Sequence, residues 1–142
     1  MRGDLYRGKR IDNGEWIYWN RFGRLTDING EPIRVEINTS ALRPYAFYVN
    51  ELPLIDEETV GQYTGLTDKN GVKIFEGDIL TFVKGATRPF RVTWDGICWK
   101  MFLLDDGRRI KYAYEIDEID YMRRSEVMGN IHDNPEFLKV MR

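Results

Sequence analysis

Three carboxylates near the middle of the sequence are the first residues whose type and spacing suggest chemistry. Asp68, Glu76 and Asp78 share one short, glycine-marked segment. A turn can bring such carboxylates together, and a pair of them can perform acid–base catalysis or hold a divalent cation. However, Asp68 adjoins an Asn70-Gly71 turn, where aspartate bonds its own backbone, and Asp78 follows a corner at Gly77. We therefore favour a structural role for these acids over a catalytic or metal-binding one.

The only histidine and the only cysteine give no stronger indication of catalysis. His132 can act as a general base only with a nucleophile in reach, and neither Ser40 nor Ser125 lies in a nucleophile-elbow pattern. We expect His132 to have a hydrogen-bonded or exposed capping role before Pro135. Cys98 lies among apolar neighbours, where burial raises the pKa of a thiol, and a single cysteine forms neither an intrachain disulfide nor a paired-cysteine metal site. The sequence thus predicts no catalytic residue, cofactor or metal, and no enzyme.

A stretch that mixes basic and aromatic residues is the strongest indication of a binding surface. Small β-barrels bind single-stranded nucleic acid by stacking bases on exposed rings within a basic groove. Asp95, Asp105 and Asp106 lie nearby, and most rings in a chain of this length are needed for the core. Nucleic-acid binding is therefore the alternative hypothesis, and its candidate residues are Arg88, Arg91, Trp94, Lys100, Arg108, Arg109 and Lys111.

Composition places the chain among soluble globular proteins. Its 142 residues, 42% of them hydrophobic and 31% charged, fit one domain or two small lobes. A formal net charge of −2 gives no general attraction to nucleic acid or to an anionic membrane. The amino-terminal residues lack the apolar segment of a signal peptide, and no apolar run is long enough to cross a bilayer. Together with the single cysteine, these features predict a cytoplasmic protein that does not bind membranes.

The glycine-marked segment over residues 60–80, VGQYTGLTDKNGVKIFEGDIL, organises the rest of the chain. Asn70-Gly71 lies between two apolar-bearing arms and tolerates positive φ at both central positions of a turn. It therefore predicts a β-hairpin with a type I′ turn. Glu76-Gly77-Asp78 predicts a second corner, after which an apolar strand begins.

The amino-terminal part predicts a β-rich lobe over residues 1–58. We expect a hairpin from about Leu5 to Leu25, with an aromatic strand over Glu15–Phe22. A half-buried strand over Pro32–Asn38 and a short aromatic strand over Tyr45–Val49 follow. The polar connection Asn50–Glu58 then places a lobe boundary between residues 58 and 59.

The carboxyl-terminal part, residues 59–142, predicts an SH3-like small barrel. Alternating apolar residues and turn signals indicate five short strands, over residues 79–84, 89–95, 98–104, 108–114 and 126–131. Residues 117–124 fit a helical turn, and Asn134-Pro135 begins another. The predicted fold is therefore mostly β, with the hairpin at Asn70-Gly71 joining the amino-terminal lobe to the SH3-like barrel.

Three blocks of the sequence together resemble the YopX family. They are VGQYTGLTDKNG over residues 60–71 with IFEGDI over 74–79, YRGKR over 6–10 with GEWIY over 14–18, and EVMGNIHDNPE over 126–136. Met128 and His132 depart from the family pattern, which favours an aliphatic residue and often tyrosine at these positions. The resemblance covers nearly the whole chain and implies a small β-rich protein encoded by a phage or prophage. It brings no assigned catalytic residue to transfer.

Two functional hypotheses follow. The first is a non-enzymatic phage or prophage accessory protein that binds another protein and forms a homo-oligomer, because the supply of aromatic residues suits an interface. The second is a nucleic-acid-binding accessory of phage replication or transcription that uses the basic and aromatic surface named above.

Overall fold

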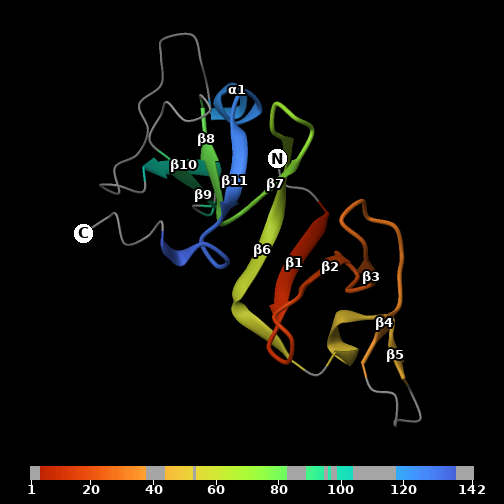
Figure 1. Ribbon diagram of the computed structural model, residues 1–142. Helices are drawn as coiled ribbons and strands as arrows, with labels where there is room; N and C mark the ends of the chain where they lie inside the picture. The colour runs from red at the N-terminus through yellow and green to blue at the C-terminus, as the bar shows by residue number, and fades with distance from the viewer. Residues whose placement is uncertain are drawn as a thin grey trace. The chain divides into compact units, whose positions relative to one another are not determined.

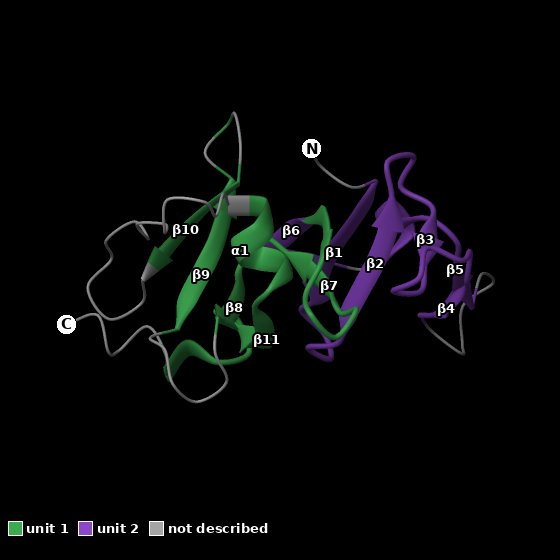
Figure 2. Cartoon of the chain, turned by 90° about the horizontal axis from the view of Figure 1, so that it is seen from above, with its two compact units in different colours: residues 1–3, 63–142 green, residues 4–62 purple. Residues whose placement is uncertain are grey.

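The computed structural model describes residues 4–37, 44–52, 54–82, 89–94, 96, 99–103 and 118–136. The chain divides into two compact units (Figure 2). Unit 2 comprises Asp4–Gln62, and unit 1 comprises Met1–Gly3 with Tyr63–Arg142. The division falls within one long strand, β6 (Ile55–Thr67). The last four residues of the connection predicted over 50–58 therefore belong to this strand.

Unit 2 is built on an antiparallel sheet in the order β3-β2-β1-β6. The strands β1 (Leu5–Arg10) and β2 (Trp16–Asn20) form the predicted first hairpin, and β1 also pairs with the first half of β6 (Figure 1). The short β3 (Leu25–Thr26) pairs with β2. Ile17 and Leu25 contribute to a buried apolar cluster with Ala46 and Leu52. The cluster gives unit 2 an apolar core of its own.

β2 is shorter than the strand predicted over Glu15–Phe22, because the Asn20 side chain ends it. Its Oδ1 accepts hydrogen bonds from the backbone N–H groups of Phe22, at 2.9 Å, and Arg24, at 3.1 Å. An asparagine that bonds backbone two residues ahead favours a turn over a continuing strand. Phe22 therefore lies in a turn and is exposed.

Two further strands predicted in this unit are also shorter than expected. A small sheet pairs β4 (Val35–Glu36) with β5 (Tyr45–Ala46), and the 3-10 helix η1 (Val49–Glu51) follows. Ile33 does not extend β4, since its N–H donates to Leu25 O at 3.1 Å and its carbonyl accepts from the Arg24 side chain. Asn38, at the end of the predicted strand over 32–38, lies outside the described residues.

Unit 1 contains a four-stranded antiparallel sheet in the order β10-β9-β8-β11. Its strands are β8 (Asp78–Thr81), β9 (Phe90–Trp94), β10 (Trp99–Leu103) and β11 (Glu126–Asn130), and the helix α1 (Glu118–Arg123) precedes β11. The second half of β6 forms a hairpin with β7 (Lys73–Phe75). The apolar core of this unit comprises Leu66, Ile74, Leu80, Phe90, Val92, Trp99, Met101 and Met122.

The mostly β class is confirmed, whereas the SH3-like barrel is not. Four of the five predicted strands are present, as β8, β9, β10 and β11, and the helical turn predicted over 117–124 is present as α1. Residues 83–84, 95, 98, 104 and 117, at the ends of these predictions, lie outside the described residues. The strand predicted over residues 108–114 lies outside the described residues. No sheet in the described part of the chain is closed on itself.

One turn occurs twice, and its sequence is Asp-x-Asn-Gly. In Asp68–Gly71 the Asp68 N–H donates to Val72 O at 2.8 Å, and the Gly71 N–H donates to Asp68 O at 3.1 Å. The Asp27–Gly30 turn repeats both bonds around Asp27, with Glu31 in place of Val72. In each turn the aspartate Oδ1 also accepts the N–H groups two and four residues ahead.

The geometry of this turn corrects the predicted type I′ hairpin. Type I′ requires positive φ at both central residues, and no described non-glycine residue has positive φ, so Asn70 does not fit. Only Gly71 is left-handed, with φ of 82°. The loop is therefore closed by the aspartate side chain and one left-handed glycine.

Candidate functional site

The acids singled out in the sequence are bonded to backbone groups of unit 1. Asp68 is 5% exposed, and its Oδ2 accepts the Val127 N–H of β11 at 2.9 Å in addition to the two turn bonds on Oδ1. Asp78 Oδ2 accepts the Phe75 N–H at 2.8 Å, so it closes the corner around Gly77. The predicted turn roles of Asp68 and Asp78 are thus confirmed. Glu76 Oε2 accepts the Trp94 N–H at 3.3 Å.

His132 and Ser125 also have structural contacts. The His132 N–H donates to Asn130 Oδ1 at 3.0 Å, and its ring lies beside Gly77, where an added Cβ would be 3.4 Å from Nε2. Ser125 Oγ donates to Tyr121 O at 2.6 Å. Ser40 and Cys98 lie outside the described residues.

The structure separates the residues predicted to bind nucleic acid. The register places Arg91 opposite Phe102 and Lys100 opposite Thr93, so these four side chains share the face of the β9–β10 pair that points away from the core. Trp94 lies on the core face instead, where its ring contacts Trp99 at 4.9 Å between centroids. The other four candidates, Arg88, Arg108, Arg109 and Lys111, lie outside the described residues.

A surface that the sequence did not predict lies in unit 2, and we call it the Arg–aromatic surface. It comprises three arginines, each lying over one or two aromatic rings: Arg21, Arg24, Arg34, Phe22, Tyr45, Phe47 and Tyr48. The Cζ of Arg34 is 4.2 Å from the centroid of the Tyr45 ring. The Cζ of Arg21 is 5.0 Å from that of Phe22. The Cζ of Arg24 is 5.4 Å from the ring of Phe47 and 5.9 Å from that of Tyr48.

Backbone contacts hold the Arg–aromatic surface in place. Arg24 Nη1 donates to Ile33 O at 2.5 Å and to Phe47 O at 3.0 Å, which lie in the segments leading into β4 and out of β5. The Val49 N–H donates to Gly23 O at 2.8 Å, which joins the Phe22 turn to η1. The rings are therefore carried by segments with fixed backbones.

The exposed rings of this surface form the walls of a pocket. Phe22 is 75% exposed and Tyr48 is 46% exposed. With Gly23, Val49, Asn50 and Glu51 they line an open pocket of about 580 Å³, which we call the Phe22–Tyr48 pocket. The Glu51 carboxylate accepts the Tyr48 N–H at 3.1 Å. The pocket thus presents two exposed aromatic rings together with polar groups.

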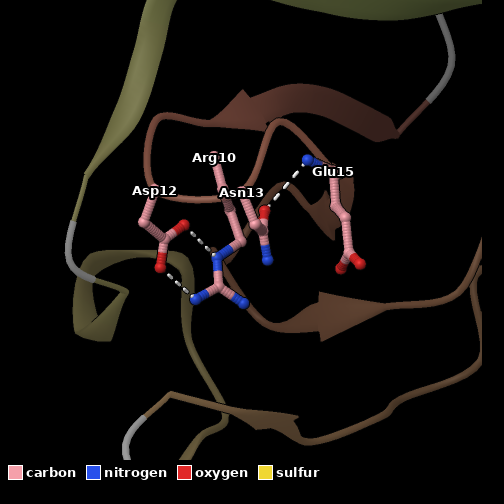
Figure 3. Close-up of polar contacts among 4 residues, drawn as sticks. All are labelled: Arg10, Asp12, Asn13 and Glu15. Atoms are coloured by element: carbon pink, nitrogen blue, oxygen red, sulfur yellow. Dashed lines mark hydrogen bonds and ion pairs between the residues drawn. The ribbon is translucent and has the colours of Figure 1, made fainter.

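The arginines of this surface differ in electrostatic environment from Arg10 of the same unit. Arg10 donates from Nε to Asp12 Oδ1 at 2.9 Å and from Nη2 to Oδ2 at 2.6 Å (Figure 3). In contrast, among the residues that the structure describes, no carboxylate forms an ion pair with Arg21, Arg24 or Arg34. Arg21 and Arg34 are exposed and can meet an incoming group, whereas Arg24 Nη1 already donates to the carbonyls of Leu25, Ile33 and Phe47.

The Arg10–Asp12 contact gives a prediction for the pH dependence of unit 2. The hydrogen bond from Arg10 lowers the pKa of Asp12 below its ordinary value of 3.8. Because the folded-state pKa is lowered, the contact stabilises the fold above the unfolded-state pKa, and this contribution is lost as pH falls through the folded-state pKa. We expect an NMR titration of the Asp12 carboxyl to show a midpoint below 3.8. Arg10→Gln is expected to move it upward, and an unchanged midpoint would contradict the assignment.

The missed site had a weak signal in the sequence. In Asn20-Arg21-Phe22-Gly23-Arg24 an aromatic residue stands between two arginines and before a glycine. The run of aromatic residues before it favoured a continuing strand. The asparagine two residues before Phe22 was the contrary signal, because asparagine side chains commonly close turns of this kind.

The fold and site define a mostly β protein with two compact units and an exposed Arg–aromatic surface on one of them. Residues 5–139 match the family described as YopX protein, and the chain belongs to the YopX family. It is also similar to the crystal structure of protein EF1440 from Enterococcus faecalis, with 25% identity, a TM-score of 0.49 and coverage of 94% of this chain and 96% of that chain. No curated protein matches the sequence. None of the helices in the described ranges has the length and apolar character needed to cross a membrane.

Proposed function

We propose that this chain is a non-enzymatic accessory protein of a phage or prophage, which acts in the bacterial cytoplasm by binding another protein. The phage origin rests on the family resemblance. The observation that carries the binding role is the Phe22–Tyr48 pocket, because a largely exposed phenylalanine beside a second exposed ring is the kind of patch that marks protein interfaces.

The composition and the fixed backbone of the Arg–aromatic surface both support this role. Phenylalanine, tyrosine and arginine are enriched in protein interfaces, and tyrosine and arginine are enriched among the residues that contribute most to affinity. The hydrogen bonds of Arg24 and Gly23 hold the segments that carry the rings, so less conformational entropy is lost on binding.

The environment of the central acids supports the non-enzymatic part of the proposal. Asp68 uses both carboxylate oxygens for backbone N–H groups, and Asp78 Oδ2 accepts the Phe75 N–H. A general acid or base must reach the proton it transfers in a substrate. Acids bonded to turn and strand backbone are instead suited to stabilising the fold.

The proposal is tested by comparing two exposed apolar residues of unit 2. Phe22→Ser removes a wall of the pocket, and Leu54→Ser changes a side chain that is 64% exposed and does not line it. In pull-downs from host cells carrying the phage, we expect Phe22→Ser to reduce recovery of the partner roughly tenfold or more. Leu54→Ser should recover it normally. Equal recovery by both variants, or no partner with the unmodified protein, contradicts the proposal.

We also expect the chain to form homo-oligomers, and to complete unit 1 as an SH3-like barrel with a fifth strand over residues 108–114. Light scattering over a concentration series tests the first expectation. If Phe22→Ser abolishes the oligomer, a second copy of this chain is the bound protein. A strict monomer at all concentrations contradicts the expected homo-oligomer.

Nucleic-acid binding stays the second candidate function because Arg91 and Lys100 share one face of the β9–β10 pair with the Phe102 ring. The seven candidate residues are the test set for this hypothesis. Filter binding to single- and double-stranded nucleic acid across a salt series decides it, since phosphate contacts give an affinity that falls steeply with salt. Absence of binding at low salt excludes this candidate.

A further inference from the structure

We infer that the Arg–aromatic surface takes an acidic peptide segment of a partner protein, with an apolar side chain in the Phe22–Tyr48 pocket and carboxylates on the stacked arginines. The inference rests on the proposed function and adds the chemical class of the partner. Three features carry it: arginines without an ion pair among the described residues, their position over aromatic rings, and a pocket lined by two of those rings.

The arginines of this surface favour a negatively charged partner. Arg21 is exposed, and Arg21, Arg24 and Arg34 have no carboxylate partner among the described residues. A guanidinium that lies over a ring can still use its edge N–H groups, and its planar fork matches a carboxylate. Arg24 Nη1 is already bonded to three backbone carbonyls, so Arg21 and Arg34 are the main candidates for this pairing. The stacking also holds the side chain, so that pairing costs less conformational entropy. Arg10, which already has a bidentate carboxylate, shows the preferred pairing within the same unit.

The three arginines belong to one end of unit 2. Arg24 bonds Ile33 O, one residue from Arg34, and Phe47 O, two residues from the Tyr45 ring under Arg34. Arg21 is next to Phe22, which lines the pocket, and Tyr48, which also lines it, lies under Arg24. A single extended segment can therefore meet the pocket and more than one of these guanidiniums.

The surrounding charges favour a peptide over a nucleic acid. Residues 4–62 carry seven Lys/Arg against ten Asp/Glu, a net charge of −3. In the β4–β5 register Glu36 lies opposite Tyr45, and Glu51 lines the pocket. A continuous row of phosphates would meet these acids, and like charges held close together are repulsive. A peptide avoids them by placing carboxylates only opposite the arginines.

Three synthetic peptides of equal length test the inference by fluorescence anisotropy with the full-length protein. Each has a central leucine, which is flanked by Asp/Glu in the first, by Asn/Gln in the second and by Lys in the third. We expect the acidic peptide to bind roughly tenfold or more tightly than the Asn/Gln peptide, and to weaken as salt is raised. The Lys peptide should bind least.

Two variants assign the binding to this surface. Arg21→Gln combined with Arg34→Gln is expected to lower the affinity for the acidic peptide by about tenfold. The affinity for the Asn/Gln peptide should not change. Arg123→Gln, at an exposed arginine of unit 1, is the matched control and should have no effect. Both altered residues of the double variant are exposed, and circular dichroism checks that the fold is retained.

The outcomes separate failure of the inference from failure of the proposed function. The inference is overturned if the acidic and Asn/Gln peptides bind equally well. If Phe22→Ser then abolishes the binding of both peptides, the result still supports protein binding through the pocket. Binding of single-stranded DNA that is lost in the arginine double variant overturns it in favour of nucleic acid. If no peptide binds and Phe22→Ser recovers its partner normally in pull-downs, both the inference and the proposed function are wrong.

Discussion

Replacing Asp68 with alanine is expected to lower the free energy of unfolding by about 3 kcal/mol. The carboxylate is nearly buried and accepts three backbone N–H groups, from Asn70, Val72 and Val127. Alanine leaves all three without this acceptor, and a buried donor that loses its partner bears the cost of its own desolvation. Because native proteins are stable by only about 5–15 kcal/mol, a loss of this size is readily measured by urea unfolding.

The repeated turn supplies the matched control. The Asp27 carboxylate accepts the same two Oδ1 bonds as that of Asp68, and no third hydrogen bond to this carboxylate is found in the described residues. We expect Asp27→Ala to cost about 1 kcal/mol, so the difference reports the contact between the turn and β11. Hydrogen exchange at the Val127 amide should accelerate in Asp68→Ala only. Equal losses for the two variants would show that the contact with β11 contributes nothing.

Gly8→Ala is expected to destabilise the protein by about 2 kcal/mol, through overpacking on β1. A Cβ at this position would lie 2.8 Å from Ile55 Cγ2 and 3.1 Å from Trp19 Cη2. A distance under 3 Å is too short for two carbon atoms, so a strand or a side chain must shift. The expected observation is a lower urea midpoint with an unchanged slope.

A double-mutant cycle tests whether Ile55 is the cause. Ile55→Ala removes the closest atom, so adding Gly8→Ala to this variant should cost less than adding it to the unmodified protein. Strict additivity of the two changes would contradict the packing explanation. Gly8 does not have positive φ, so the expected cost comes from the close contacts of an added Cβ and not from backbone strain.

Local signals predicted most of the β elements, because turn chemistry and period-two alternation act over a few residues. Asn13-Gly14 and Asn70-Gly71 both correctly marked hairpins, although the latter turn is not type I′. The alternation of Phe90, Val92 and Trp94 correctly predicted β9 and its buried face. The ends of the strands were less well predicted at Phe22 and Ile33. There the side chains of Asn20 and Arg24 form hydrogen bonds with backbone groups that a longer strand would use.

The candidate site was predicted poorly because it depends on contacts between distant segments. Arg24 meets Phe47 and Tyr48, more than twenty residues away in the sequence. Nothing near Arg24 in the sequence indicates which ring it will cover. In the same way, Trp94 lies among basic residues in the sequence but on the core face in the structure.

The β class, the positions of most strands and turns, and the membership of the YopX family could all be predicted without coordinates, since these depend on local backbone preferences and on matching residues. Only the folded chain shows that Asp68 bonds β11, and that Arg21, Arg24 and Arg34 lie over aromatic rings with no ion-paired carboxylate among the described residues. The physical reason is that hydrogen bonding and stacking require atoms within a few ångströms, and only the folded chain brings these residues to such distances.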